Sequence, residues 1–489
     1  MNEQNDKKSN IPANRRDFLR TSALISAGAW IAGCTASTEK PKTVAQAAPM
    51  AQPPAEAPLP TSRPNIACIG IGGKGDGDST HAGRFGNIVA ICDVDERSLD
   101  KKAKEFPKAK RYNDYRKMYE EMGNMIQGVT VSTPDHHHFM ASMMAIKLGK
   151  NVYCQKPLTH TVAEARALRE AARKAKVITQ MGNQGTANSE LRRGVELLRA
   201  NALGAVKEVH IWTNRPVWPQ APIIMARPPE DPVPNYLNWD LWIGPAPMRP
   251  YSGQIQNNGH PPYHNFNWRG WWDFGTGALG DMGCHTANMP FMGLELGYPT
   301  SIQGECGDLN PETYPSWATV AYEFPARGSK PPLKLTWWEG HKTENGQKVR
   351  NIPGHKVTAG FDLPESGSLV IGDKGMMMSL SDYGSDNEII LNAMEDFGPI
   401  SVPKTLPRHA SNNMDESQKR EWIAAFAGGP KPLSNFEYAG KLAEFIVLGN
   451  IAIRMQGAKL LWDGPGMKFT NNEEANQYLK TDYREGWSV

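Results

Sequence analysis

Residues 66–75 read Ile-Ala-Cys-Ile-Gly-Ile-Gly-Gly-Lys-Gly, a short apolar run that ends in glycines. Gly70, Gly72 and Gly75 have the spacing Gly-x-Gly-x-x-Gly, and Gly73 and Lys74 complete the turn. In a strand–turn–helix unit that binds a dinucleotide, the first glycine allows a tight turn, the second lets the backbone approach a pyrophosphate, and the third lets the helix pack closely on the strand. The phosphates bind at the N-terminus of that helix. The stretch therefore predicts a nucleotide-binding turn.

A second apolar run, residues 88–92, ends at Asp93. An acidic residue about 20 positions after the glycines is where such a unit hydrogen-bonds the ribose of the adenosine. A carboxylate at that point disfavours a 2′-phosphate, so the sequence predicts NAD, with NADP less favoured although Arg97 follows closely. The competing interpretation is an ordinary turn followed by a solvated aspartate.

Strand and helix patterns alternate through the next hundred residues. Helical spacing covers residues 97–105, 136–148 and 162–174, and apolar strand-like runs cover 128–132, 151–154 and 177–180. This alternation predicts a doubly wound parallel sheet with helices on both faces, over residues 63–184. Ligands of such sheets bind beyond the carboxyl ends of the strands. Beside the glycine turn, we expect that edge to bring together Asp93, Thr133, Pro134, His138, Gln155, Lys156 and Asn183.

Length and composition set further limits. A chain of 489 residues exceeds what one hydrophobic core usually serves, so at least two domains are expected. The formal net charge of +3 gives no reason to expect a nucleic-acid partner. The six cysteines form no C-x-x-C pair, and three adjacent histidines, 136–138, point in different directions on a helix, so we expect no metal site.

The first 62 residues resemble an export signal and a tether. Arg15 and Arg16 precede an apolar stretch of residues 22–33, as in a twin-arginine (Tat) signal, and the Ile-Ala-Gly-Cys ending at Cys34 resembles a lipobox. Residues 35–62 are rich in Ala, Pro, Ser and Thr and are expected to be a flexible linker. The sequence thus predicts a periplasmic protein that is lipid-anchored at Cys34, with no other membrane attachment. The Tat route carries folded proteins, so a cytoplasmic nucleotide would have to be tightly held.

The remainder, residues 185–489, has a different pattern. Strand-like runs at 206–214, 318–324, 333–338, 368–371 and 375–380 predict a β-rich half, with helices at 189–200, 421–427 and 438–454. Between 215 and 268 the chain is dense in Pro, Trp and Asn, and a long irregular stretch of this kind is usually functional or a partner surface.

Several motifs together resemble the Gfo/Idh/MocA oxidoreductases, the family of glucose-fructose oxidoreductase and inositol dehydrogenase. They are the glycine motif, Cys-Asp-Val-Asp at 92–95, Ser-Thr-Pro-Asp-His-His-His at 132–138, Lys-Pro at 156–157 and Gly-Ala-Leu-Gly-Asp-Met-Gly-Cys-His at 277–285. The resemblance implies an N-terminal Rossmann domain, a C-terminal α/β domain with a large open, mainly antiparallel sheet, and hydride transfer between NAD(P) and a sugar or polyol. It also implies a homo-oligomer, a dimer or tetramer. One departure is Gln155, where the family has glutamate before the lysine.

The resemblance maps the family's catalytic set onto Lys156, Asp281 and His285. Asp281 and His285 are spaced i and i+4, so on a helix they share one face and can meet. A histidine that titrates near neutral pH suits removal of a hydroxyl proton, Asp281 could orient it or contact the substrate, and Lys156 could stabilise charge on the reacting oxygen. From spacing alone, a surface Asp-His hydrogen bond without chemistry is an equal alternative.

Three functions remain open at this point. The first is an exported NAD-dependent oxidoreductase acting on a secondary hydroxyl of a sugar, polyol or glycoside. The second is a glycoside hydrolase that uses bound NAD to form a transient 3-keto sugar. The third is a lipid-anchored sugar-binding protein without catalysis, which Gln155 favours and the intact Lys156, Asp281 and His285 oppose.

Overall fold

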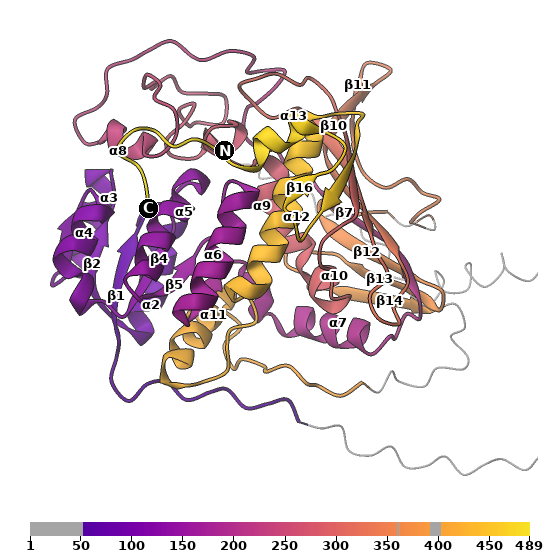
Figure 1. Cartoon of the computed structure of the whole chain (residues 1–489), viewed down its shortest axis with the longest axis horizontal. Helices are drawn as coiled ribbons and strands as arrows, with labels where there is room; N and C mark the ends of the chain where they lie inside the picture. The colour runs from indigo at the N-terminus through magenta and orange to yellow at the C-terminus, as the bar shows by residue number, and fades with distance from the viewer. Residues whose placement is uncertain (1–51, 359, 361, 392–401) are drawn as a thin grey trace, which may run out of the picture. The chain divides into compact units, whose positions relative to one another are not determined.

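A computed structural model describes residues 52–358, 360, 362–391 and 402–489 (Figure 1). The predicted signal at Arg15 and Arg16, the lipid-attachment cysteine Cys34 and most of the predicted linker lie outside the described residues. Within this part of the chain, no helix combines the length and the apolar character needed to cross a membrane.

The first sheet is parallel and has six strands in the order β3-β2-β1-β4-β5-β6. The strands are β1 (Asn65–Ile69), β2 (Asn87–Cys92), β3 (Lys110–Tyr112), β4 (Gly128–Val131), β5 (Asn151–Cys154) and β6 (Thr179–Met181). The connecting helices are α2 (Lys74–Phe85), α3 (Glu96–Glu105), α4 (Tyr115–Met122), α5 (Asp135–Lys147) and α6 (Val162–Ala175). The predicted doubly wound sheet is confirmed.

Burial on both faces explains the near-continuous apolar strands. The four residues of β4 are all buried, as are four of the five in β1, which is the pattern of a parallel sheet that helices cover on each side. Asp95 and Asp114 cap α3 and α4, and Thr161 and Glu164 form a capping box at the start of α6. These local signals fix where each helix begins and therefore where each strand end faces.

The second sheet has ten strands and is mainly antiparallel, as the resemblance implies. Its main path is β14-β13-β12-β7-β10-β9-β8-β15-β16, with β11 paired to β10, and the β7–β10 pair is parallel. The strands are β7 (Val206–Thr213), β8 (Ser301–Cys306), β9 (Trp317–Phe324), β10 (Leu333–Glu344), β11 (Gln347–Arg350), β12 (Gly367–Gly372), β13 (Gly375–Ser379), β14 (Asn387–Leu391), β15 (Lys459–Asp463) and β16 (Lys468–Phe469).

Helices connect this sheet to the first one. α12 (Phe436–Arg454) is buried along most of its length. It contacts α6, which packs on the first sheet, and β8 of the second sheet. α9 (Gly277–Thr286) packs on α12, β7 and β10, and α10 (Asn288–Gly293) packs on α7 (Ser189–Arg199). In Figure 1, α12 and α9 lie between the first sheet and the strands of the second. α12 therefore links the two sheets, and α9 lies beside α12 on the second sheet.

The structure also contains elements that the pattern did not predict. β3, β8, β11, β14, β15 and β16 were not expected: β3, β8, β11 and β16 carry few large apolar residues, and the apolar runs of β14 and β15 are only three residues long. α11 (Met414–Ala424) begins seven residues before the predicted start at 421, because Asn413 caps it and its first turn is polar. This earlier start matters, since the added residues include Gln418, which accepts a hydrogen bond from Tyr153 of β5, and Lys419, which pairs with Asp78 of α2.

Candidate active site

The glycine turn has the geometry that its spacing predicts. Gly70 has φ +71°, and a Cβ there would lie 2.7 Å from the backbone of Ser132. A Cβ on Gly75 would lie 1.9 Å from the carbonyl oxygen of Gly70, so only glycine lets α2 approach β1 this closely. Gly73, with φ +50°, has open space on the corresponding side. The turn thus leaves room beside its own backbone.

The first turn of α2 is available to an anion. Its N-cap, Gly73, has no side chain that could cap the first N–H groups. Such uncapped N–H groups, together with the helix dipole, favour a negatively charged ligand. Lys74 adds a cation at this position, although its Nζ already pairs with Asp415 at 2.5 Å and Asp78 at 3.2 Å.

Asp93 lies at the end of β2 and faces the glycine turn. Its Oδ2 accepts hydrogen bonds from the backbone N–H groups of Ile71 at 2.8 Å and Gly72 at 3.1 Å, and its Oδ1 accepts one from the N–H of Asp95 at 3.0 Å. Burial raises the pKa of Asp93, and these backbone donors oppose that shift. The carboxyl group is therefore held in one orientation beside the turn.

A cavity of about 510 Å³ runs along the carboxyl edge of the first sheet. A volume of this size is typical of small-molecule sites. Among the predicted site residues, its wall includes Gly70, Gly72, Gly73, Lys74, Asp93, Thr133, Pro134, Gln155, Lys156 and Asp281. Residues from the ends of β1, β2, β4 and β5 and from α9 thus converge, as the rule for parallel sheets predicts. Gly75, His138, Asn183 and His285 are not part of this wall.

His138 and Asn183, expected at the cofactor, instead hold loops together. Both ring nitrogens of His138 face carbonyl oxygens, Nδ1 that of Pro157 at 2.7 Å and Nε2 that of Thr133 at 2.9 Å. Burial lowers the pKa of His138, but Cys154, Asp135 and the carbonyl of Pro157 outweigh it and raise the pKa to about 9. Asn183 is fully buried and accepts a 2.5 Å hydrogen bond from Ser434. The sequence did not indicate that the side chains of His138 and Asn183 form buried hydrogen bonds to other loops.

Lys156 and Asp281 meet at the other end of the cavity. The Nζ of Lys156 donates to Oδ1 of Asp281 at 2.7 Å and to its backbone carbonyl at 2.7 Å. The Nε atoms of Arg269 and Arg215 lie 3.4 and 3.8 Å from the same carboxylate. Burial alone would raise the pKa of Asp281, but Lys156 and the two arginines hold it well below its usual range. Asp281 is therefore a permanent carboxylate that faces three cations.

His285 does not pair with Asp281. No hydrogen bond joins the two side chains in the described structure, and Nδ1 of His285 is buried without a partner. The expected pair does not form because Lys156 and the arginines already occupy the carboxylate. The ring of His285 packs edge-on against Tyr383 at 5.0 Å. Burial, followed by the charge of Lys156, lowers the pKa of His285 well below its ordinary value, so the expectation of a histidine titrating near neutrality is also corrected.

Gln155 is part of a buried polar network. Its Nε2 donates to Oδ2 of Asp78 at 2.7 Å, and Ser132 donates to the same oxygen at 2.8 Å. Lys419 of α11 pairs with Oδ1 of Asp78 at 2.7 Å, and both side chains are fully buried. Burial would raise the pKa of Asp78, yet Lys419 and Lys74 hold it well below its usual range. The carboxylate absent at position 155 is therefore present nearby, on α2.

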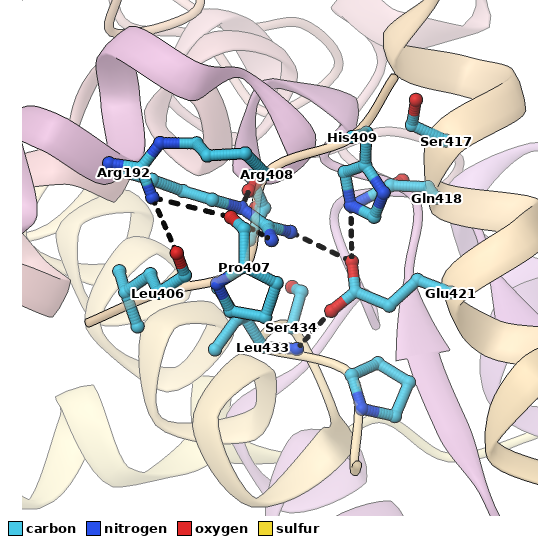
Figure 2. Close-up of polar contacts among 12 residues, drawn as sticks. Arg192, Leu406, Pro407, Arg408, His409, Ser417, Gln418, Glu421, Leu433 and Ser434 are labelled. Carbon is cyan, nitrogen blue, oxygen red and sulfur yellow. Dashed lines mark hydrogen bonds and ion pairs between the residues drawn. The ribbon is translucent and has the colours of Figure 1, made fainter. Parts of the chain in front are cut away.

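The rest of α11 is fixed by Glu421, shown in Figure 2. Its carboxylate faces Arg192 of α7 at 2.8 Å and His409 at 3.4 Å, and it accepts a hydrogen bond from the N–H of Leu433 at 3.2 Å. Gln418 donates to the carbonyl of Asn183 at 3.1 Å. These contacts anchor the helix that delivers Lys419 to Asp78. The sequence could not indicate this network, because Asn183 and Arg192 are far along the chain from α11.

His136 and His137 are also buried, and both Nε2 atoms face the carbonyl oxygen of Trp242 at 3.1 and 3.0 Å. Among residues 52–391 and 402–489, as far as they are described, no group of three or more His, Cys, Asp or Glu side chains is arranged to hold a metal ion. The histidines thus connect α5 to the Trp-rich stretch that follows β7.

The cavity fits a nicotinamide dinucleotide. A pyrophosphate requires close backbone approach, which the open space beside Gly73 allows at the start of α2, a helix without a side-chain cap. Asp93 and Lys156 lie near opposite ends of the same cavity, after β2 and β5. His264 and Arg269 also line it, although the sequence singled out only the stretch that contains them.

Comparisons with known proteins agree with this arrangement. Residues 65–183 match the oxidoreductase family's NAD-binding Rossmann fold, and residues 218–342 match its C-terminal alpha/beta domain. The chain is 36% identical over 127 residues to D-xylose 1-dehydrogenase (NADP(+)) of Hypocrea jecorina, which covers 24% of this chain and 31% of that protein. It is 32% identical over 124 residues to inositol 2-dehydrogenase of Salmonella paratyphi B, covering 23% of this chain and 35% of that protein. The chain thus spans about a third of the length of these curated relatives.

Structural likeness extends further along the chain. The WlbA dehydrogenase of Bordetella pertussis, solved with NADH and UDP-GlcNAcA, has a TM-score of 0.56 and 13% sequence identity over 82% of this chain and 99% of that one. At this identity the likeness concerns the fold. Because both of its domains match those of one family and the site lies where their edges meet, the chain belongs to the Gfo/Idh/MocA oxidoreductase family.

Proposed function

We propose that this protein is an NAD-dependent oxidoreductase that acts on a secondary hydroxyl of a sugar, polyol or glycoside. The observation that carries the proposal is the contact between Lys156 and Asp281 at one end of a cavity whose other end has the glycine turn and Asp93. The names of the xylose and inositol dehydrogenases support a hydroxylated substrate.

The residues at this end can carry the proton chemistry. When bound, the nicotinamide would accept the hydride from the carbon that bears the hydroxyl. Lys156 would donate a hydrogen bond to the hydroxyl oxygen and stabilise charge that develops on it. His285 lies on α9 four residues after Asp281, is neutral, and is buried just outside the cavity wall, and we assign it the role of taking the hydroxyl proton. Asp281 would keep Lys156 in place, a role that differs from orienting the imidazole.

We further propose NAD over NADP. The carboxyl group of Asp93 is held by three backbone N–H groups at the end of β2, where a 2′-phosphate would meet a like charge. Its orientation therefore supports a ribose with a free 2′-hydroxyl. Replacing Asp93 with Ser should reduce this preference, measured as the ratio of the NAD and NADP dissociation constants.

Export and assembly are part of the same proposal. Arg15, Arg16 and Cys34 support Tat transport and a lipid anchor in the periplasm. One face of the second sheet packs on α9 and α12, so the other face would suit contact between copies of the chain in a dimer or tetramer. Membrane fractionation of Cys34→Ala and size-exclusion chromatography of the mature protein test these two points.

One experiment separates this proposal from the alternatives. The purified protein is denatured and its released nucleotide identified, and the native protein is incubated with sugars, polyols and aryl glycosides while reduced nicotinamide and free aglycone are measured together. Oxidation of a sugar with reduction of the nicotinamide supports the proposal. Release of aglycone without net reduction would favour the hydrolase, and neither signal from a protein that binds sugar would favour the non-catalytic alternative.

A further inference from the structure

We infer that two segments outside the nucleotide sheet belong to the cofactor site and keep the nucleotide from leaving. One is residues 236–266, here called the strap, and the other is residues 480–489, here called the closing segment. The inference rests on the proposed function, because it concerns the same cavity. Residues 343–489 lie beyond the parts of the chain that match the family's two domains.

The strap is hydrogen-bonded to the turn after β2. The N–H of Glu96 donates to the carbonyl of Tyr236 at 2.8 Å, and the N–H of Asn238 donates to that of Val94 at 2.9 Å. At the other end of the strap, Nε2 of His264 lies 3.0 Å from Oδ2 of Asp95. The strap is thus attached at both ends to the segment that immediately follows Asp93.

Side chains strengthen this attachment. Arg97 donates to both oxygens of Asp95 and lies 3.7 Å over the ring of Tyr236. Burial would raise the pKa of Asp95, but His264 and Arg97 hold it well below its usual range. The carboxylate therefore remains charged and keeps both contacts at neutral pH.

Between these ends the strap passes over the cavity. Within it, α8 (Trp239–Ile243) presents the carbonyl of Trp242 to His136 and His137 of α5. Strap residues in the cavity wall are Leu241, Trp242, His260, His264, Asn265 and Phe266. A nucleotide in the cavity would therefore be covered by the strap.

The closing segment holds the strap in turn. Arg484 donates to the carbonyl of Gly244 at 2.9 Å and to the side chain and carbonyl of Asp240 at 2.5 and 3.0 Å. Its own N–H bonds the carbonyl of Pro245 at 3.0 Å. Tyr483 donates to Glu164 of α6 at 2.9 Å, which fixes the segment to the first domain.

Trp487 completes the cavity wall. Its indole is 6% exposed and packs edge-on against Tyr115 at 6.0 Å and His137 at 5.5 Å. The guanidinium of Arg116 lies 4.1 Å over the same ring, and its Nη1 donates to the carbonyl of Gly486 at 3.3 Å. An aromatic side chain from the far end of the sequence is therefore built into the nucleotide domain.

The order of strands places this wall at the end of the cavity that has Asp93. Tyr115 follows β3 and Asp93 follows β2 on one side of β1, Lys156 follows β5 on the other side, and His137 follows β4, which lies between β1 and β5. The strap and Trp487 therefore cover the Asp93 end of the cavity, and the end of the strap reaches toward Asp281 through Arg269, which donates to the carbonyl of Phe266 at 3.0 Å. Release of the nucleotide would require the attached segments to separate.

The test measures exchange of the bound nucleotide in the full chain. Protein purified with its nucleotide is mixed with excess etheno-NAD, a fluorescent analogue, and uptake of the analogue and release of the original nucleotide are followed by fluorescence and chromatography. The variants are Arg484→Ala and Trp487→Ala, with Trp487→Phe as the conservative replacement. Arg173→Ala, an exposed arginine on α6, is the matched control.

We expect the parent, Trp487→Phe and Arg173→Ala to exchange slowly, and Arg484→Ala and Trp487→Ala to exchange at least about tenfold faster, since the opened segments no longer limit release. Circular dichroism of each variant checks that the fold is kept. Exchange in the parent as fast as mixing, or equal rates in the parent and both alanine variants, would overturn the inference. A parent that releases no nicotinamide nucleotide on denaturation, and that when purified without nucleotide binds neither NAD nor its analogue, would instead overturn the proposed function, and the two failures are thereby distinguished.

Discussion

The side chain of Lys156 is bonded to Asp281 twice, through the carboxylate Oδ1 at 2.7 Å and through the backbone carbonyl at 2.7 Å. Lys156 follows β5 of the first sheet and Asp281 lies on α9, which packs on the second sheet. The contact therefore joins the two domains at the point where we place the reaction. Since Asp281 also faces Arg269 and Arg215, its charge balances several cations.

Asp281→Asn should reduce turnover by about ten- to a thousandfold, because Lys156 would lose the charge that holds it in place. The nucleotide content should not change. Steady-state kinetics on a confirmed substrate check this, and Asp382→Asn, whose carboxylate lies 4.0 Å from Arg215, is the matched control. Equal turnover in the parent and Asp281→Asn would show that the contact has no catalytic role.

Gln155→Glu should destabilise the protein, because it would place a second carboxylate beside that of Asp78, at a contact that now measures 2.7 Å. An uncompensated buried charge of this kind costs about 3–5 kcal/mol. The double change Gln155→Glu with Asp78→Asn exchanges acid and amide across the same contact and should recover most of the loss. Chemical denaturation, with nucleotide content measured in parallel, tests this. A single variant as stable as the parent would contradict it.

Turnover should not fall at acidic pH in the way that protonation of an ordinary histidine would cause. The pKa of His285 is lowered well below its usual value by burial and by Lys156, so the ring stays neutral as the pH falls through 6.5. We expect kcat/KM to remain level through that range, with the fold monitored by circular dichroism at each pH. A tenfold loss per pH unit beginning near 6.5, which is absent from a variant lacking His285, would contradict the assignment.

The ionisation of Glu339 should lower the free energy of unfolding as the pH rises. Burial raises the pKa of Glu339 from 4.5 to about 8, and its Oε2 accepts a 2.6 Å hydrogen bond from Trp337. Between these values the folded state keeps a proton that the unfolded state has lost, so stability falls with pH by on the order of 4 kcal/mol. Glu339→Gln should remove this slope in denaturant titrations between pH 5 and 8, whereas Glu305→Gln on an exposed position of β8 should keep it. Parallel slopes in the parent and Glu339→Gln would contradict the prediction.

Much of the first domain could be predicted from the sequence, because glycine spacing and apolar runs are patterns of residues close together in the chain. The roles of Gly70 and Gly75 follow from their spacing alone, and the strand ends at Asp93, Thr133 and Gln155 meet because parallel strands share an edge. α3 and α6 begin within one residue of the starts that the periodicity predicts, 97 and 162.

The rest depends on contacts between distant segments. The i, i+4 spacing of Asp281 and His285 allowed a pair, but Lys156, 125 residues away, takes the carboxylate. Similarly, the sequence indicates only that a carboxylate is missing at Gln155, whereas in the structure Gln155 bonds the carboxylate of Asp78, which pairs with Lys419. Trp487 gave no signal at all, since nothing in the sequence indicates that residues 480–489 return to α4 and α5.

The central claim is that Lys156 and His285 carry the proton chemistry of a hydride transfer at this site. The measurement that tests it most directly is the rate at which the bound nucleotide is reduced in a single turnover with saturating sugar, in the parent, Lys156→Ala, His285→Ala and the double variant. We predict that each single change slows the reduction by about two to four orders of magnitude with the nucleotide still bound, and that the double variant loses much less than the product of the two. Reduction at near-parental rate in His285→Ala would contradict the account and direct the search for the base to Tyr263 and His264.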